Sequence, residues 1–125
     1  MNNVEIVRQF ISEWDAPSPN GETLGSYFTE NALYHNIPME PVEGKAAITA
    51  TLGGMAGMMT SKGWDLLNIV GEGNIVMTER IDKFEAGENK VALPVMGVFE
   101  LTDGKIASWR DYFDLGTFQK QMAGG

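Results

Sequence analysis

Apolar residues recur at helical spacing over much of the first half of the chain. Over residues 4–14 this spacing predicts an amphipathic helix with an asparagine at position 2 or 3 as its N-cap, and its apolar stripe is Val4, Val7, Ile11 and Trp14. Two prolines and a glycine in residues 16–21 break that helix, and a short helix is expected near residues 23–28. A longer helix is predicted over residues 45–62, where the spacing returns at Ile48, Leu52, Met55 and Met59.

Other segments show the alternation that is typical of strands. A short strand is predicted at residues 32–37, and four longer segments rich in β-branched and aromatic residues follow, at residues 64–70, 74–84, 90–101 and 105–114. Short glycine-containing turns join these four, so consecutive strands are expected to be antiparallel. Asp103-Gly104 favours a type I′ hairpin turn, because both central positions of that turn need positive φ. A short helix is expected over residues 115–122, and residues 123–125 are expected to fray.

Helices followed by a meander of strands predict the α+β class. We expect a strongly curved mixed or antiparallel sheet with the helices packed on one face. A curved sheet that is covered in this way can form a cone with a deep pocket. The sequence shows no internal repeat and no low-complexity segment that favours another architecture.

Composition narrows the classes of function. The chain has 125 residues, which is the size of a single domain over residues 1–125, and 9 basic against 17 acidic residues give a net charge of −8. Such a charge repels phosphate backbones and anionic lipids, so neither a nucleic acid nor a membrane partner is expected. There is no cysteine, and the N-terminus has neither a basic leader nor an apolar core. We therefore expect a cytoplasmic protein.

The sequence offers little for a metal or a nucleotide cofactor. One histidine and no cysteine make a typical zinc or transition-metal site hard to assemble. Gly71-Glu72-Gly73 lacks the third glycine of a dinucleotide-binding loop, and no Gly-Lys-Ser/Thr phosphate loop or Gly-x-Ser-x-Gly nucleophile elbow is present.

Charged residues lie within predicted strands that are otherwise apolar. By alternation, Arg80 and Asp82 share a face with Phe84, and because the opposite face is also partly apolar we expect this strand to be covered on both sides. On the last strand, Asp111 is flanked on its face by Trp109 and Phe113. Two interpretations are open: an ordinary ion pair with a separate backbone contact for Asp111, or three charged groups that meet in one apolar pocket. In such a pocket one acid would keep its proton while the other ionises.

Tyr34 and Asn36 lie on one side of the early strand, with His35 on the other. A phenol and an amide can together hold a water molecule, because they supply donors and acceptors in a fixed arrangement. Taken alone, the pair is better explained by a core tyrosine and a turn-forming asparagine at the end of the strand.

Taken together, these segments resemble the limonene-1,2-epoxide hydrolase family. The resemblance covers nearly the whole chain from about Val4, and its motifs, in the family's order, are Tyr34-His35-Asn36-Ile37-Pro38, Glu79-Arg80-Ile81-Asp82, Gly97-Val98-Phe99-Glu100-Leu101, Asp103-Gly104-Lys105-Ile106 and Trp109-Arg110-Asp111-Tyr112-Phe113-Asp114. It implies the cone-shaped fold that this family shares with nuclear transport factor 2 and ketosteroid isomerase. It also implies a homodimer with no metal and no cofactor.

The resemblance further implies a role for each residue of the site. Asp111 corresponds to the general base, Asp82 to the general acid and Arg80 to the bridge between them, while Tyr34 and Asn36 would position the attacking water. The implied pocket positions, which hold the apolar part of the substrate, are Trp109, Phe113, Phe84, Leu93 and Val95.

The expected activity is hydrolysis of an apolar epoxide, terpene-like and cyclic or bearing aryl or alkyl groups, to a vicinal diol. Proton delivery to the ring oxygen during water attack avoids a free alkoxide, and an ionised Asp111 with a protonated Asp82 supplies both halves of this step. Two alternatives are a ketosteroid-isomerase-like isomerase or cyclase, and a non-catalytic protein that binds an apolar ligand. An isomerase has no need of Arg80 between two carboxylates, and a binding protein would retain ligand without forming a diol.

Overall fold

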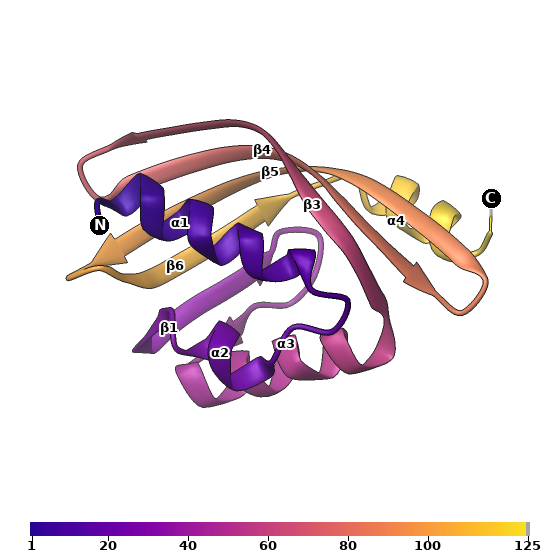
Figure 1. Ribbon diagram of the computed structural model, residues 1–125, viewed down its shortest axis with the longest axis horizontal. Coiled ribbons are helices and arrows are strands. Elements are labelled where there is room, and N and C mark those ends of the chain that lie inside the picture. The colour runs from indigo at the N-terminus through magenta and orange to yellow at the C-terminus, as the bar shows by residue number, and fades with distance from the viewer. Residues whose placement is uncertain (125) are drawn as a thin grey trace.

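Helices cover one face of a single curved sheet in the computed structural model, which describes residues 1–124 (Figure 1). The helices are α1 (Asn3–Ser12), the 3₁₀ turn η1 (Glu13–Asp15), α2 (Gly21–Gly25), α3 (Lys45–Met58) and α4 (Leu115–Met122). The strands are β1 (Phe28–Asn36), β2 (Val42–Glu43), β3 (Thr60–Glu72), β4 (Ile75–Ala86), β5 (Asn89–Thr102) and β6 (Lys105–Tyr112). The predicted α+β class is confirmed. Gly125, part of the end expected to fray, lies outside the described residues.

The sheet is mixed, with the strand order β2-β1-β6-β5-β4-β3. Each strand from β3 to β6 is antiparallel to the next, as the short turns predict, whereas β1 lies parallel to β6. Asp103 and Gly104, at the β5–β6 turn, have φ values of 49° and 77°, which confirms the positive φ expected there. Within residues 1–124 no helix is both long and apolar enough to cross a bilayer.

The first strand differs from its predicted bounds. It begins at Phe28 instead of residue 32, because its pairing with β6 shifts register between Phe28 and Leu33 and the polar residues inside this irregularity hide the alternation. The preceding helix, α2, accordingly ends at Gly25. Strand β2 was not predicted, since two residues are too few to show a period.

The main core lies between α1, α3 and the concave face of the sheet, and aromatic side chains dominate it. The side chain of Asn2 caps α1 by accepting a hydrogen bond from the backbone N–H of Glu5 at 2.9 Å. Phe10 of α1 then packs edge-on against Trp109 of β6, with ring centroids 5.0 Å apart. This contact fixes the helix over the middle of the sheet, where the charged residues of β4 and β6 lie.

The outer face of the sheet is exposed in the single chain, so none of the described elements of this chain covers β4 on both sides as expected. Met77 and Met96 are 44% and 49% exposed on this face, whereas Thr78 and Arg80 on the inner face are buried. Burial therefore alternates along β4, and the helices pack against the inner face alone (Figure 1).

Candidate active site

Three charged side chains from two strands meet on the inner face of the sheet. The guanidinium of Arg80 donates from Nε and Nη2 to the two oxygens of Asp82, at 2.9 and 2.8 Å. It also donates from Nη1 and Nη2 to the two oxygens of Asp111 on β6, at 3.2 and 2.8 Å. The residues are 0%, 7% and 4% exposed, so this is a buried cluster and not a surface ion pair. Of the two interpretations open from the sequence, the structure supports convergence.

Gly97 on the intervening strand β5 leaves the space that this convergence requires. It pairs with Thr78 of β4 on one side and with Asp111 of β6 on the other. A Cβ atom at Gly97 would lie 2.5 Å from Nη1 of Arg80 and 2.6 Å from Oδ1 of Asp111, closer than non-bonded atoms approach. The hydroxyl of Thr78 accepts a further hydrogen bond from Nη1 of Arg80 at 3.1 Å, which fixes the guanidinium from the side.

Burial and charge set the protonation of the cluster. Burial raises the pKa of Asp82 to about 6, against the opposing effect of Arg80, and the nearby charge of Asp111 adds to the rise. Burial acts to lower the pKa of Arg80, but the carboxylates Asp111 and Asp82 outweigh it and hold that pKa above its ordinary value. Arg80 therefore stays charged, and Asp82 keeps its proton to a higher pH than an ordinary aspartic acid.

Tyr34 and Asn36 reach the cluster from β1. The parallel pairing with β6 places Tyr34 beside Trp109 and Asn36 beside Asp111. Nδ2 of Asn36 donates to the hydroxyl of Tyr34 at 3.0 Å, which leaves the phenolic proton free to be donated elsewhere. Burial, followed by the charge of Asp111, raises the pKa of Tyr34, so the phenol stays a neutral donor.

An apolar cavity of about 240 Å³ opens beside these polar groups. The predicted site residues Asp82, Asp111, Tyr34 and Asn36 line it, and so do four of the five predicted pocket positions: Phe84, Leu93, Val95 and Phe113. Trp109 is the exception. It is fully buried in the core behind Asp111, to which its indole Nε1 donates a hydrogen bond of 2.7 Å. Alternation placed Trp109 on the face of Asp111 but did not show that the aromatic core covers it.

Several residues that contact the site were not singled out as site residues from the sequence. Trp64 of β3 lies over the guanidinium of Arg80, with 4.8 Å from Cζ to the ring centroid. Further apolar lining comes from Met39, Met55, Met59 and Phe118. A lone aromatic or methionine carries no sequence signal for a pocket, because the same residues fill cores. Among residues 1–124 no group of three His, Asp or Glu side chains is placed to hold a metal ion.

The curved sheet with helices on its inner face is a ketosteroid-isomerase-like α+β fold. A solved protein of that fold from Catenulispora acidiphila, in complex with trimethylamine, superposes with a TM-score of 0.83 at 19% identity, over 95% of this chain and 92% of that one. The model of the limonene-1,2-epoxide hydrolase catalytic domain matches residues 2–124. The chain therefore belongs to the limonene-1,2-epoxide hydrolase family.

Both a curated sequence and a solved structure from Mycobacterium tuberculosis are similar to this chain. The epoxide hydrolase EphG is 32% identical over 96 residues, which are 75% of this chain and 62% of that protein. The match thus spans less than two thirds of EphG. A solved limonene-epoxide-hydrolase-like epoxide hydrolase superposes with a TM-score of 0.83 at 28% identity, over 98% of this chain and 90% of that one.

Proposed function

We propose that this protein is an epoxide hydrolase that converts an apolar epoxide to a vicinal diol by one-step, acid- and base-assisted attack of water. The observation that carries the proposal is the bridging of Asp82 and Asp111 by one guanidinium at the wall of an apolar cavity. Membership of the limonene-1,2-epoxide hydrolase family supports it.

In this mechanism one carboxyl activates the attacking water and the other protonates the departing ring oxygen. Asp111, ionised, takes a proton from a water molecule held with Tyr34 and Asn36, and the water oxygen forms a bond to one epoxide carbon. The bond between that carbon and the ring oxygen breaks, and Asp82 gives its proton to the departing oxygen. The product is a diol, and transfer of one proton from Asp111 back to Asp82 restores the starting state. Arg80 holds both carboxyls in place and does not titrate.

The cavity favours a compact hydrocarbon substrate. Its volume of about 240 Å³ lies below the range of about 300–1,000 Å³ that is common for ligand pockets. Its wall away from the carboxyls is formed by aromatic, aliphatic and thioether side chains. Such side chains can bury the apolar surface of a substrate without requiring hydrogen bonds from it. We propose a cyclic, terpene-like epoxide, or a small aryl or alkyl epoxide, as the substrate.

Turnover in oxygen-labelled water tests the proposal. The protein is incubated with limonene oxide and with cyclohexene oxide, and the diol is analysed by mass spectrometry and chiral chromatography. We expect one labelled oxygen per diol, and we expect Asp111→Asn to lower kcat/KM by about 100-fold or more because the base is lost.

The matched control is Asp65→Asn on β3, which makes the same change at an exposed carboxyl. It should leave turnover unchanged. Circular dichroism should show that both variants keep the fold. Retention of the epoxide without any diol would overturn the proposal in favour of the binding protein, and near-wild-type turnover by Asp111→Asn would overturn the assignment of the base.

We further propose that the chain forms a homodimer through the outer face of its sheet. Met77, Met96 and Tyr112 are exposed there, and Met96 pairs with Tyr112 in the β5–β6 register. Arg110 and Glu100 form an ion pair on the same face, so the patch carries both charges. Such a patch can oppose a second copy of itself across a two-fold axis, where each charge meets its opposite.

A further inference from the structure

The two carboxyls share one guanidinium but receive different numbers of hydrogen bonds. All five N–H groups of Arg80 are used: two go to Asp82, two to Asp111 and one to Thr78. Asp111 accepts one more bond, from the indole Nε1 of Trp109 to the same Oδ1 atom that accepts from Nη1 of Arg80. Three donors therefore face Asp111 and two face Asp82, and hydrogen bonds to a carboxylate favour its charged form.

The indole of Trp109 is held rigidly in the orientation that this bond requires. The ring of Tyr34 stacks on it at 4.3 Å and the ring of Phe99 at 5.4 Å, with interplanar angles of 19° and 16°. The ring of Phe10 of α1 packs against the same indole in a T-shaped arrangement. The N–H of Trp109 thus points at Asp111 before any substrate arrives. Its face also orients Tyr34, one of the two residues proposed to hold the water.

The charged and titratable groups that face Asp111 leave this asymmetry intact. Arg80 and Asp82 face it from β4, and Tyr34 faces it from β1. The intervening strand β5 presents Gly97, which carries no side chain. Arg80 donates two hydrogen bonds to each carboxyl, so the number of its hydrogen bonds does not distinguish them. The hydrogen bond from Trp109 is the contact that distinguishes them.

Building on the proposed function, we propose that Trp109 is a positioning residue that makes Asp111 the base and Asp82 the acid, by donating its indole N–H to Asp111. Without that bond the two carboxyls accept equal numbers of hydrogen bonds from Arg80, and the single proton of the cluster is shared more evenly between them. When the proton is on Asp111, Asp111 cannot accept a proton from water, and Asp82 has no proton to give to the epoxide oxygen. The role is indirect, because Trp109 does not line the cavity.

The test distinguishes the effect of the indole N–H group from the effect of the aromatic ring. Trp109→Phe keeps an aromatic side chain, and site-specific incorporation of benzothienylalanine at position 109 keeps the bicyclic shape while sulfur replaces N–H. We expect both variants to lower kcat by about tenfold near neutral pH with KM nearly unchanged, and to move the acidic limb of the rate profile upward by about one pH unit. Carboxyl NMR signals, assigned with Asp82→Asn, should show more of the shared proton on Asp111.

Phe10→Leu is the matched control for packing, since it loosens the core around Trp109 and leaves the N–H in place. It should lower the melting temperature without moving the acidic limb. If wild-type protein forms diol but the benzothienyl variant keeps the wild-type profile and the wild-type position of the proton, the inference about Trp109 is overturned and the proposed function stands. If wild-type protein forms no diol, the proposed function fails, and the NMR comparison still decides where Trp109 holds the proton.

Discussion

At the scale of single residues, Asp82 is a carboxyl whose pKa is raised by burial. When both carboxyls ionise, one guanidinium faces two negative charges inside a cluster that is almost completely buried. A protonated Asp82 leaves the cluster neutral, which the apolar surroundings favour. The protein therefore holds a proton that the unfolded chain would have released, and its stability must depend on pH.

The sign of that dependence follows from the pKa of Asp82. Burial raises it from 3.8 to about 6, so the stabilisation from this proton is complete below pH 3.8 and is lost as the pH rises through about 6. We expect the free energy of unfolding of the wild-type protein, relative to that of Asp82→Asn, to fall by about 2 kcal/mol between about pH 4.5 and about pH 8. Urea denaturation at both pH values measures it.

Comparison with a neutral variant cancels the titration of the groups outside the cluster, which both proteins share. Asp65→Asn, at an exposed carboxyl, provides the control and should run parallel to the wild type. If the curves for wild type and Asp82→Asn also run parallel, Asp82 does not hold a proton in the folded state and the assignment of the acid is lost.

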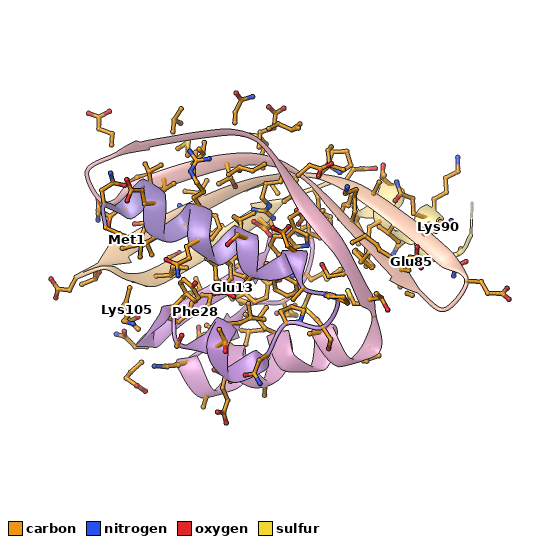
Figure 2. All side chains as sticks on the ribbon, viewed as in Figure 1. Met1, Glu13, Phe28, Glu85, Lys90 and Lys105 are labelled. Carbon is orange, nitrogen blue, oxygen red and sulfur yellow. The ribbon has the colours of Figure 1, made fainter. Side chains whose placement is uncertain are left out.

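At the scale of elements, α4 completes the wall of the cavity and covers a free strand edge. Strand β6 ends at Tyr112, whereas β5 extends back to Asn89 at the tip of the β4–β5 hairpin, which Glu85 and Lys90 mark in Figure 2. There the side chain of Gln121 takes the place of a neighbouring strand: its Oε1 accepts from the backbone N–H of Ala92 at 2.7 Å, and its Nε2 donates to the carbonyl of Ala92 at 3.2 Å. This attachment holds α4, which contributes Phe118 to the cavity.

Loss of this attachment should loosen α4 without unfolding the sheet. We expect Gln121→Ala to raise the rate of amide hydrogen exchange in α4 by about fivefold, which corresponds to about 1 kcal/mol for the lost hydrogen bonds. KM should rise more than kcat falls, because Phe118 lines the cavity beside Phe84 and Phe113, where we expect the hydrocarbon part of the proposed substrate to lie.

Lys120→Ala is the control, because it makes the same kind of truncation at an exposed neighbouring position. Exchange that rises equally in both variants would show that the Gln121 contacts do not hold α4 against β5.

The elements also show what the sequence can and cannot predict. Local signals were sufficient for α4 and for the β5–β6 hairpin, since the helical spacing and the Asp103-Gly104 turn need no distant partner. Alternation then placed Arg80 and Asp82 on one face. The parallel pairing of β1 with β6 is not encoded locally, because it joins segments that are far apart in the chain. Tyr34 and Asn36 were therefore brought to the site by the resemblance to the family, and not by periodicity.

Features that depend on a missing side chain or on a single N–H group were harder still to predict. Gly97 matters because a Cβ atom would collide with Arg80, and Trp109 matters through a single N–H directed at Asp111. Neither property changes the pattern of hydrophobic and polar positions in the sequence. Trp109 was accordingly expected in the pocket wall, although it lies in the core one layer behind it.

At the scale of the whole molecule, the exposed outer face of the sheet contrasts with the strongly acidic surface. A net charge of −8 disfavours association through most of the surface, because identical chains repel each other. The outer face offers apolar side chains and a balanced ion pair between Arg110 and Glu100 instead. The proposed homodimer places two such faces against each other and leaves the cavity, on the opposite side of each sheet, unobstructed.

We expect Met96→Glu to convert the dimer into a monomer, measured by sedimentation equilibrium over a range of protein concentrations. Met96 is 49% exposed, so the change costs the isolated chain little, but across a two-fold axis it buries two carboxylates in an apolar contact. Met58→Glu introduces the same charge at a methionine that is 83% exposed at the end of α3, and it should leave the dimer intact. Because the site is built from one chain, the Met96→Glu monomer should retain diol formation. A wild-type protein that sediments as a monomer at every concentration, or a Met96→Glu variant as dimeric as the wild type, would show that this face is not the interface.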